Sequence, residues 1–265
     1  MQQADKAQRA IQSIEVGGRL LLVLADSAEP LALKDLAARA GLSASRAHPY
    51  LVSYARLGLV EQEQLGARYR LGPAALRIGL TCLHQMDPMR EAEPVIQELA
   101  ARTGHAVMLA VWGNFGPTVV RLIEARQALH IALRVGSVMA LLETATGRAF
   151  AATLPPERLA EPAGRFGELA ARDRPAGRAP SLAELELARG EMARHGVTRA
   201  AGSPLPGVNA FSAAAFDHEG TAVLVVTALD HADRLSSDWD GPSAGAVREA
   251  ARRISQRLGM HAAER

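Results

Sequence analysis

The feature that most constrains this chain is a pair of short helical patterns joined by a glycine turn and followed by a two-stranded pattern. The segment "EPLALKDLAARAG" repeats its apolar residues at helical spacing and ends at Gly41, a residue that commonly terminates helices. The segment "LSASRAHPYLVSYARLG" follows, with Ser43 as a candidate N-cap. Two helices joined by a tight glycine-containing turn predict a helix-turn-helix.

The residues after the second helix predict a β-hairpin. In "RLGLVEQEQLGARYRLG" two strand-like runs flank a turn at 65–67. Arg68 and Arg70 alternate with Tyr69 and Leu71, so the arginines can face a phosphate backbone while the apolar pair packs inward. A hairpin in this position is typical of the wing of a winged helix. The alternative is a solvated edge hairpin whose charges are incidental.

Pro49 lies inside the second predicted helix. With Ser43 as the cap it takes about the sixth helical position, and with Ser45 as the cap the fourth; in both cases it removes a backbone hydrogen bond. Such a proline costs about 3 kcal/mol in a regular helix interior. We therefore expect a kink or a loosened first turn. We also expect three apolar residues to form the buried side of this helix: Leu51, Val52 and Leu57.

Two further helices flank this region. Before it, "SIEVGGRLLLVLAD" places Ile14, Leu21, Leu22 and Leu24 near helical spacing. After it, "PAALRIGLTCLHQMD" begins at Pro73 and repeats leucine over too short a length for a long coiled coil. Its apolar surface is sufficient to contact a partner helix. We interpret it as a linker that also helps the chain to dimerise.

From about residue 87 the pattern changes to mixed helices and strands. A helix is expected over 87–103, with Pro94 bending it or resetting its start. Three short β-rich runs follow, "HAVMLAVWG", "PTVVRLIEA" and "LHIALRVG". A small-residue helix "TATGRAFAATL", a helix over 181–196 with a Ser181–Glu184 capping box, two strands and a final helix complete the chain. Residues 161–180 are expected to form a surface excursion with a short helix.

Composition limits the class of protein. Hydrophobic residues make up 48% of the chain and aromatic residues only 4%, so the core must be aliphatic. No apolar run reaches the roughly 18 residues of a membrane span, and the first residues lack the apolar stretch of a signal peptide. One cysteine, Cys82, excludes an intrachain disulfide and a cysteine-based zinc cluster. We therefore expect a cytoplasmic protein without a membrane partner.

The basic residues are almost all arginine, since Lys6 and Lys34 are the only lysines. Arginine suits two-pronged contacts with phosphate and guanine. Arginine and alanine richness also arises from a GC-rich genome, so composition alone is weak evidence for a nucleic-acid partner.

Taken in order, "LKDLAARAGLSASRAHPYLVSYARLGLVEQ", "RYRLGPAALRIG", "TATGRAFAATLP" and "GVNAFSAAAFDHEG" resemble an IclR-type transcriptional regulator over nearly the whole chain. The resemblance implies an α+β protein with a winged helix-turn-helix at 1–72, a linker helix at 73–87 and an effector-binding domain at 88–265. That domain is expected to hold a curved antiparallel sheet like those of GAF and PAS folds. The family assembles as dimers or dimers of dimers, and most members repress catabolic operons.

This sequence departs from the family pattern at two places. Pro49 stands where the family usually has a helix-compatible residue, often arginine. The strand "VNAFSAAAFD" stands where the family more often has an apolar-Ala-Ala-Pro-Val turn. The first departure puts the usual docking on DNA in doubt, and the second suggests a modified sheet edge near the pocket.

The candidate DNA contacts lie on the second helix and the wing. Ser45 and Arg46 are the leading candidates, because Arg46 can fork onto a guanine and the first turn of a recognition helix reaches base edges. The full set of expected contacts is Ser43, Ser45, Arg46, His48, Tyr50, Arg56, Arg68 and Arg70. The partner is double-stranded operator DNA. The alternative is a ligand-binding dimer that Pro49 has deprived of tight operator binding.

The candidate effector site combines "RVGSVMALLETATGR" with the strand at 207–216. We expect exposed backbone amides at the start of the small-residue helix to bind a carboxylate, with help from the helix dipole. The expected lining residues are Met139, Leu141, Thr144, Ala145, Thr146, Gly147, Asn209 and Ser212. The effector class is a small organic acid, aromatic acids included. The alternative is simple close packing of helix on sheet, and His130 is interpreted as a surface or sheet histidine.

An enzyme is the competing class. We expect no catalytic site of the kinds marked by G-x-S-x-G, H-E-x-x-H, G-x-G-x-x-G or the P-loop. Cys82 is interpreted as a small core residue, and a metal held by Cys82 and His84 is rejected because two ligands are a weak signal. The sequence thus predicts a DNA-binding regulator, a repressor rather than an activator, that forms a homodimer or homotetramer and needs no cofactor or metal.

Overall fold

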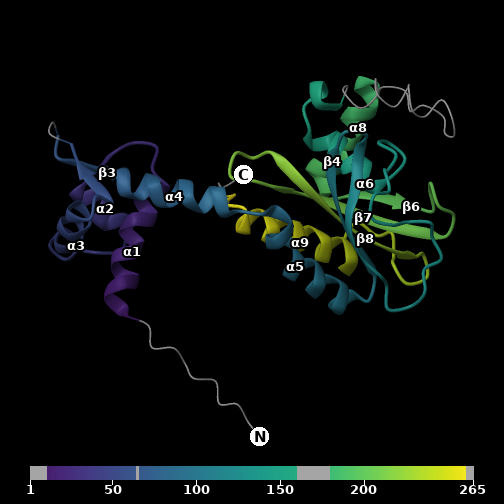
Figure 1. The fold of residues 1–265 in the computed structure, drawn as a ribbon, viewed down its shortest axis with the longest axis horizontal. Coiled ribbons are helices and arrows are strands. Elements are labelled where there is room, and N and C mark those ends of the chain that lie inside the picture. Colours follow the sequence, from purple (N-terminus) through teal and green to yellow (C-terminus); the bar gives the residue numbers. More distant parts are fainter. Residues whose placement is uncertain (1–10, 64–65, 160–179, 261–265) are drawn as a thin grey trace, which may run out of the picture. The chain divides into compact units, whose positions relative to one another are not determined.

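The computed structural model describes residues 11–63, 66–159 and 180–260. The chain divides into two compact units, Met1–Met86 and Asp87–Arg265 (Figure 1). Each unit has its own hydrophobic core, and the division falls directly after the helix that was expected to link two domains.

The first unit is a helix-turn-helix followed by a hairpin. Its elements are α1 (Gln12–Ala25), β1 (Leu31–Ala32), α2 (Leu33–Arg39), α3 (Ala44–Arg56), β2 (Val60–Gln62), β3 (Arg68–Leu71) and α4 (Pro73–Gln85). The strands form a three-stranded antiparallel sheet in the order β1-β3-β2. The two-residue strand β1 was not expected from the sequence; it pairs Leu31 with Tyr69 and ties the start of α2 to the wing.

The core of the first unit is a cluster of aliphatic side chains from all three leading helices. Leu20, Leu36 and Leu51 are fully buried, and Tyr69 of β3 closes the cluster from the sheet. The apolar residues that recur at helical spacing in α1 do not all face the core. Ile14 and Leu22 are 69% and 62% exposed, whereas Leu24 is buried together with Val16, Gly17 and Leu20. The helix thus carries a second apolar face that points to solvent.

The second unit is an open five-stranded antiparallel sheet with helices on both faces. Its elements are α5 (Pro88–Thr103), β4 (Ala106–Gly113), β5 (Gly116–Ile123), α6 (Ala145–Thr153), α8 (Leu182–His195), β6 (Thr198–Ala201), β7 (Val208–Phe216), β8 (Ala222–His231) and α9 (Pro242–Arg257). The strand order is β5-β4-β8-β7-β6. The short edge strand β6 was not expected from the sequence.

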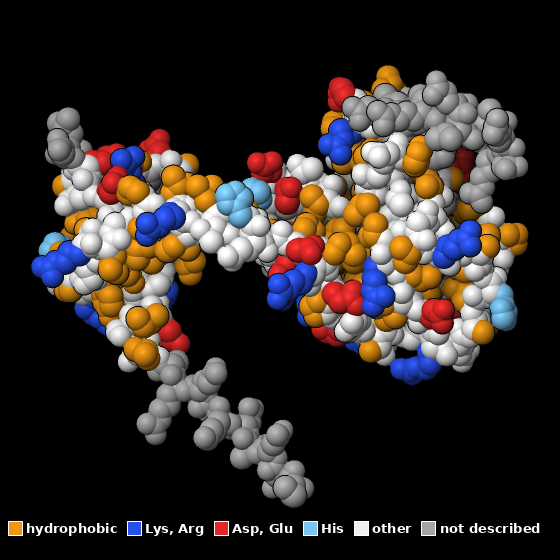
Figure 2. Space-filling model, in the orientation of Figure 1, with side chains coloured by type: hydrophobic (Ala, Val, Ile, Leu, Met, Phe, Trp, Pro, Cys, Tyr) orange, Lys and Arg blue, Asp and Glu red, His pale blue; other side chains and the backbone are white. Residues whose placement is uncertain are grey.

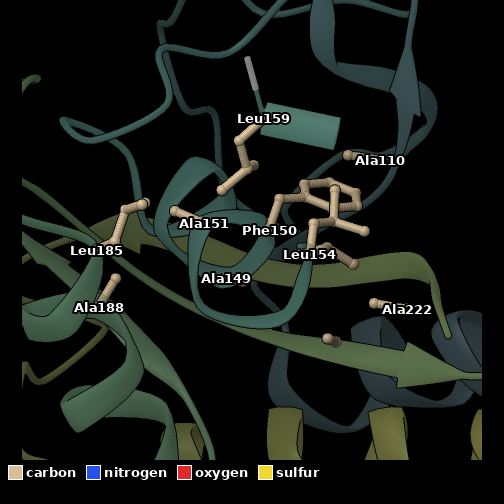
Figure 3. Packing of buried hydrophobic residues seen from close by; sticks show 11 residues of the cluster. Ala110, Ala149, Phe150, Ala151, Leu154, Leu159, Leu185, Ala188 and Ala222 are labelled. Carbon is tan, nitrogen blue, oxygen red and sulfur yellow. The ribbon is translucent and has the colours of Figure 1, made fainter. Parts of the chain in front are cut away.

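The two faces of this sheet carry different helices. Figure 1 shows α5 and α9 running side by side along one face, where they contact strands β4, β7 and β8. Arg253 of α9 pairs with Glu98 of α5 at 2.8 Å, and Arg257 pairs with Glu91 at 2.6 Å. On the other face α6 packs against β7 and β8, with α8 beside it. Apolar side chains of α6, α8 and the sheet form a buried cluster there, and Figure 3 shows Phe150 of α6 inside it.

The third β-rich run, at 129–136, does not form a strand as expected. Leu129, Ile131 and Leu133 do alternate, but they pack as a cover over the apolar side chains of β4, β5 and β8. The chain approaches the edge of β5 only from the end of this run: the Gly136 amide donates to the Val119 carbonyl at 2.8 Å, and Val138 forms an isolated bridge with Thr118. The period-two pattern is therefore satisfied by packing on the sheet rather than by pairing within it.

The excursion expected at 161–180 lies outside the described residues, except for its last residue. Among the described residues, no helix is both long enough and apolar enough to cross a membrane.

Candidate functional site

The recognition-helix candidate α3 begins with a side-chain cap. The Ser43 hydroxyl accepts a hydrogen bond from the Arg46 amide at 3.4 Å, and it lies 3.1 Å from the Ser45 hydroxyl. Ser43 is therefore the cap, and Pro49 is the sixth helical residue. We expected a kink or a loosened first turn. The helix runs without interruption from Ala44 to Arg56, so its first turn is not loosened.

The position of Pro49 on α3 explains why the helix tolerates it. Pro49 and Ser45, the two ends of the missing backbone bond, are both exposed. The Ser45 carbonyl can therefore bond to water, which lowers the cost of the lost hydrogen bond relative to a buried site. The Ser53 hydroxyl donates to the Pro49 carbonyl at 3.0 Å and adds a contact on the next turn.

The solvent face of α3 is wider and more apolar than expected. Ser45, Arg46 and His48 are exposed, as a recognition surface requires. The expected core residues Val52 and Leu57 are also exposed, at 38% and 65%, and only Leu51 of that set is buried. Spacing of three and four residues puts Val52 on the same face as Ser45, Pro49 and Arg56. That face therefore combines polar, cationic and methyl-bearing groups.

Tyr50 contributes to the packing of α3 on α1. It is half-buried and packs with Tyr54 over Gly17 of α1, where an added Cβ would collide with both rings. Burial and the neighbouring Tyr50 raise the pKa of the Tyr54 phenol. We expected Tyr50 to brace a phosphate; its ring also packs between α3 and α1, and part of the side chain remains accessible.

The two wing arginines, Arg68 and Arg70, differ in the groups that they contact. The Arg70 guanidinium pairs with Glu61 across the hairpin at 2.9 Å, with both side chains largely exposed. Arg68 donates one bond to the Pro30 carbonyl at 3.2 Å and remains exposed. Tyr69 packs inward as expected, whereas Leu71 is 38% exposed. An exposed pair such as Arg70–Glu61 is worth at most about 1 kcal/mol, so a phosphate can displace the carboxylate.

In the second unit, hydroxyl side chains form a band across the sheet beneath α6. Thr198, Ser212 and Thr227 lie opposite one another on β6, β7 and β8. All three are at most 1% exposed. On β7 and β8, the residues two positions before and after Ser212 and Thr227 point to the same face of the sheet. Those on one side of the band belong to one apolar cluster, and those on the other side belong to a second. The band is thus a polar strip between two aliphatic regions.

Thr146 of α6 completes a ring of hydroxyls over this strip. Its Oγ1 lies 2.8 Å from Thr227 Oγ1 and 3.5 Å from Ser212 Oγ, and the last two atoms are 2.7 Å apart. Thr198 instead donates to the Ala145 carbonyl at 2.6 Å. Sequence reasoning identified Thr146 and Ser212 but missed Thr198 and Thr227. Their alternation with aliphatic residues on strands was the signal that could have found them.

The start of α6 does not offer exposed amides, contrary to expectation. Thr144, Ala145, Thr146 and Gly147 are all buried. The Thr144 hydroxyl caps the helix by accepting from the Gly147 amide at 2.9 Å and donates to the Ala140 carbonyl at 2.6 Å. A Cβ at Gly147 would collide with the carbonyls of residues 140 and 141. The helix start is therefore closed by its own chain.

Asn209 does not join the other expected effector residues. It is three residues from Ser212 on the regular part of β7, so the two side chains point to opposite faces of the sheet. Its amide donates to the Leu235 carbonyl at 2.8 Å and its carbonyl oxygen accepts from the Gly202 amide at 3.1 Å. Asn209 thus links the loop that contains Gly202 to the loop that contains Leu235, on the sheet face covered by α9.

The remaining expected residues separate in the same way. Met139 packs, like Leu129 and Ile131, against the apolar cluster of β4, β5 and β8, and Leu141 packs against the α6 cluster. The two residues therefore flank the hydroxyl band from its two sides. His130 is exposed and lies outside any strand.

Cys82 is exposed on α4 and is not the core residue that we expected. No group of three potential metal ligands occurs in the part of the chain that the structure describes.

Comparison with known proteins agrees with this architecture. Residues 80–256 match the family "Bacterial transcriptional regulator IclR C-terminal", and residues 13–64 match the IclR helix-turn-helix domain. The Glycerol operon regulatory protein of Streptomyces coelicolor is 32% identical over 144 residues, which span 54% of this chain and 57% of that protein. The HTH-type transcriptional repressor AllR of Klebsiella pneumoniae is 24% identical over 98% of this chain and 94% of its own length.

Two solved structures extend the comparison. Pseudomonas aeruginosa HmgR superposes with a TM-score of 0.84 at 36% identity, over 95% of this chain and 100% of that chain. The Agrobacterium tumefaciens repressor BlcR superposes with a TM-score of 0.75 at 20% identity, over 96% and 99%, and supports the fold alone. The chain belongs to the IclR family of bacterial transcriptional regulators.

Proposed function

We propose that this chain is a transcriptional repressor that binds operator DNA through α3 and the wing and releases it when a small organic acid binds the second unit. The observation that carries the DNA-binding part is the exposed face of α3, with Ser45, Arg46 and His48 presented next to a hairpin bearing Arg68 and Arg70. Relatives named as repressors, such as AllR of Klebsiella pneumoniae, favour repression.

On DNA, the roles divide by chemistry. Arg46 is proposed to fork onto the O6 and N7 atoms of a guanine in the major groove, and Ser45 to bond to a neighbouring base edge. Pro49 and Val52 supply apolar surface for a thymine methyl group. Arg56 and Arg68 are proposed to contact phosphates, which position the helix without reading sequence.

For the effector, the hydroxyl ring of Thr146, Ser212 and Thr227 is the proposed anchor. A hydroxyl both donates and accepts and can rotate, so three mutually bonded hydroxyls can turn their protons toward a bound carboxylate. A carboxylate accepts such bonds strongly. Met139 and Leu141, on either side of the band, would contact the carbon skeleton of the acid.

Self-association is proposed through α4. No residue of this 13-residue helix is buried in the single chain, and an isolated helix of that length is marginal in water. Leu76, Leu80 and Leu83 follow one another at helical spacing and are 65%, 46% and 37% exposed. Figure 2 shows hydrophobic side chains at the surface of the first unit.

Leu80→Glu should therefore shift the chain toward monomer in sedimentation equilibrium, whereas Thr81→Glu on the opposite side of α4 should not.

The experiment that tests DNA binding uses the purified chain and the DNA upstream of its own gene, at two salt concentrations, beside Pro49→Arg. Sequence-specific binding that weakens as salt increases is the expected result, since phosphate contacts release counterions. Binding by Pro49→Arg alone would mean that the fold is intact and that Pro49 prevents docking. Absence of binding by both would overturn the regulator and favour a ligand-binding dimer.

The effector part is tested separately on the same complex. A panel of small carboxylic acids is titrated against the protein in the presence and absence of operator DNA. Because coupling between two sites is reciprocal, an acid that weakens DNA binding must itself bind less tightly when DNA is bound. Identical DNA affinity with and without every acid that binds would remove the proposed coupling.

A further inference from the structure

A second group of polar residues lies on the sheet face opposite the hydroxyl ring, where β4, β8 and α9 meet. His105, just before β4, places Nδ1 3.0 Å from Asp230 Oδ2 and Nε2 3.1 Å from Ser243 Oγ. His105 is 8% exposed and Asp230 2%, while Ser243 keeps part of its surface accessible. The order of the three groups, hydroxyl to imidazole to carboxylate, is that of an activated serine nucleophile.

Asp230 is held so that only one oxygen faces the imidazole. Its Oδ1 accepts bonds from Arg234 at 2.6 and 3.0 Å and from the His231 amide at 2.8 Å. Burial alone would raise the pKa of Asp230, but the hydrogen bonds from Arg234, His105 and the His231 amide outweigh burial and hold that pKa below its ordinary value. Asp230 is therefore a carboxylate with Oδ2 directed at His105.

That carboxylate assigns the roles of the two imidazole nitrogens. A carboxylate can only accept, so Nδ1 of His105 must carry the proton that it donates to Asp230. Nε2 of the neutral ring is then an acceptor, and the Ser243 hydroxyl donates to it. Both distances fall within the roughly 2.6–3.2 Å reach required of a general base and its orienting group. The arrangement is poised to remove the proton from Ser243.

Ser243 occupies a position suited to a nucleophile. It is the second residue of the 16-residue helix α9, and the Gly245 amide bonds back to the Gly241 carbonyl at 3.2 Å. Within the helix, the amides of Ser243 and Ala244 have no carbonyl partner, because the first N–H groups of a helix are unpaired. They lie at the positive end of the helix dipole, where they can bond to a developing oxyanion.

The sequence itself carries a sign of this site, which we missed when we expected no catalytic site of the G-x-S-x-G kind. Residues 241–245 read "GPSAG", which has the spacing of the G-x-S-x-G hydrolase pentapeptide. The setting differs from a tight strand-to-helix elbow, since ten residues separate β8 from α9. The histidine and the aspartate are 138 and 13 positions away along the chain, so spacing alone could not link them to Ser243.

We propose that Ser243, His105 and Asp230 form a catalytic serine site that hydrolyses short-chain carboxylic esters. Short acyl groups are favoured because Ser243 keeps only part of its surface accessible, and Gly241, Ala244 and Gly245 add little side chain that could block the approach of a small ester. This activity is separate from DNA binding and from the hydroxyl ring on the other face of the sheet.

The reaction proceeds in two acyl-transfer steps. Ser243 Oγ attacks the ester carbonyl carbon while His105 Nε2 takes the hydroxyl proton. The tetrahedral oxyanion is held by the Ser243 and Ala244 amides and collapses; the ester C–O bond breaks, and the alcohol leaves with the proton from Nε2. Water then attacks the acyl-serine, gives one proton to Nε2, and displaces Ser243 Oγ, which recovers that proton as the carboxylic acid departs. No oxidant, metal or other co-reactant is consumed.

The test uses the full chain, a fluorophosphonate that labels activated serines, and hydrolysis of p-nitrophenyl acetate. Mass spectrometry is expected to find the label on Ser243 of the folded protein, and heat-denatured protein should not react. His105→Gln removes the base but can retain hydrogen bonds, so we expect labelling and hydrolysis to fall by about 10²-fold or more. Asp230→Asn should also slow both, because it favours the wrong imidazole tautomer.

Controls separate catalysis from a purely structural cluster. Ser236→Ala changes an exposed serine on the loop between β8 and α9 and should leave both rates unchanged. Ser243→Ala should abolish labelling while its thermal unfolding and operator binding stay near those of the natural chain. The proposal is overturned if the fluorophosphonate does not label Ser243 in the folded natural protein. It is also overturned if labelling persists undiminished in His105→Gln.

Discussion

The Tyr54 hydroxyl occupies the place where a side chain on residue 17 would begin, so that Gly17 of α1 lies directly against the ring of Tyr54 on α3. This contact brings the backbone of α1 close to the recognition-helix candidate. The orientation of α3, and with it the presentation of Arg46 and His48, depends on a position that tolerates no side chain.

Gly17→Ala should therefore destabilise the first unit by about 1–3 kcal/mol, the usual cost of overpacking a core. The matched control is Gly18→Ala, one residue along the same helix, where an added methyl group meets nothing within 4 Å. That control should stabilise the unit by up to about 1 kcal/mol because alanine is the better helix former. Chemical denaturation of both variants measures the difference, and equal effects would contradict this packing argument.

Replacing the two arginines of α3 one at a time should distinguish base-specific recognition of DNA from non-specific contact with its phosphates. Arg46→Ala should cost about 1–3 kcal/mol, roughly 5- to 150-fold in affinity, on the preferred operator and less on other DNA. Arg56→Ala should weaken binding about equally on all sequences and lower the salt slope by about one unit. Titrations against operator and scrambled duplexes at several salt concentrations measure both quantities. Reversal of the two patterns would exchange the proposed roles.

The hydroxyl ring predicts a specific loss of effector binding. Thr227→Val keeps the shape of the side chain but removes one donor and leaves the Thr146 and Ser212 hydroxyls with one partner fewer. A hydrogen bond of this kind is worth about 1 kcal/mol or somewhat more, so affinity for the acid should fall by about tenfold. Thr221→Val, at an exposed turn position, serves as the control and should bind normally. Calorimetric titration with the same acid compares the two.

Asp230 predicts how stability responds to acid. Its pKa is lower in the folded chain than in the unfolded chain, whose ordinary value is about 3.9. The unfolded state therefore binds a proton at Asp230 more readily than the folded state does. The contribution of Asp230 to the free energy of unfolding is fully present above about pH 4. It is lost as the pH falls through the lower pKa of the folded state. Asp230→Asn removes this contribution at neutral pH.

The measurement is the unfolding free energy of the natural chain and of Asp230→Asn between pH 7 and pH 3. The difference between them should be largest at neutral pH and should narrow below about pH 4. Asp233→Asn is the control, because the Asp233 side chain is 75% exposed and lies 3.9 Å from Arg234. A gap that stays constant across this range would mean that Asp230 does not titrate as described.

Local chemistry in the sequence was sufficient for most helices. Ser43 caps α3, Ser181 and Glu184 form a capping box on α8, and Gly196 takes the left-handed conformation that ends it, all as the residue types predict. These features depend on groups within four residues of one another, so neighbouring residues specify them in any tertiary context. The resemblance of the ordered motifs to one family also predicted the two-part architecture that the structure and the family models confirm.

Tertiary structure decided what each side of an element contacts. Asn209 and Ser212 lie on one strand, but only the helices packed on the two faces determine that one holds loops and the other joins the hydroxyl ring. The alternating run at 129–136 covers the sheet because apolar residues need burial, and packing over β5 supplies it without strand pairing. His105 meets Asp230 across 125 positions of chain. Contacts of that separation follow from how the chain closes on itself, which local residue patterns do not specify.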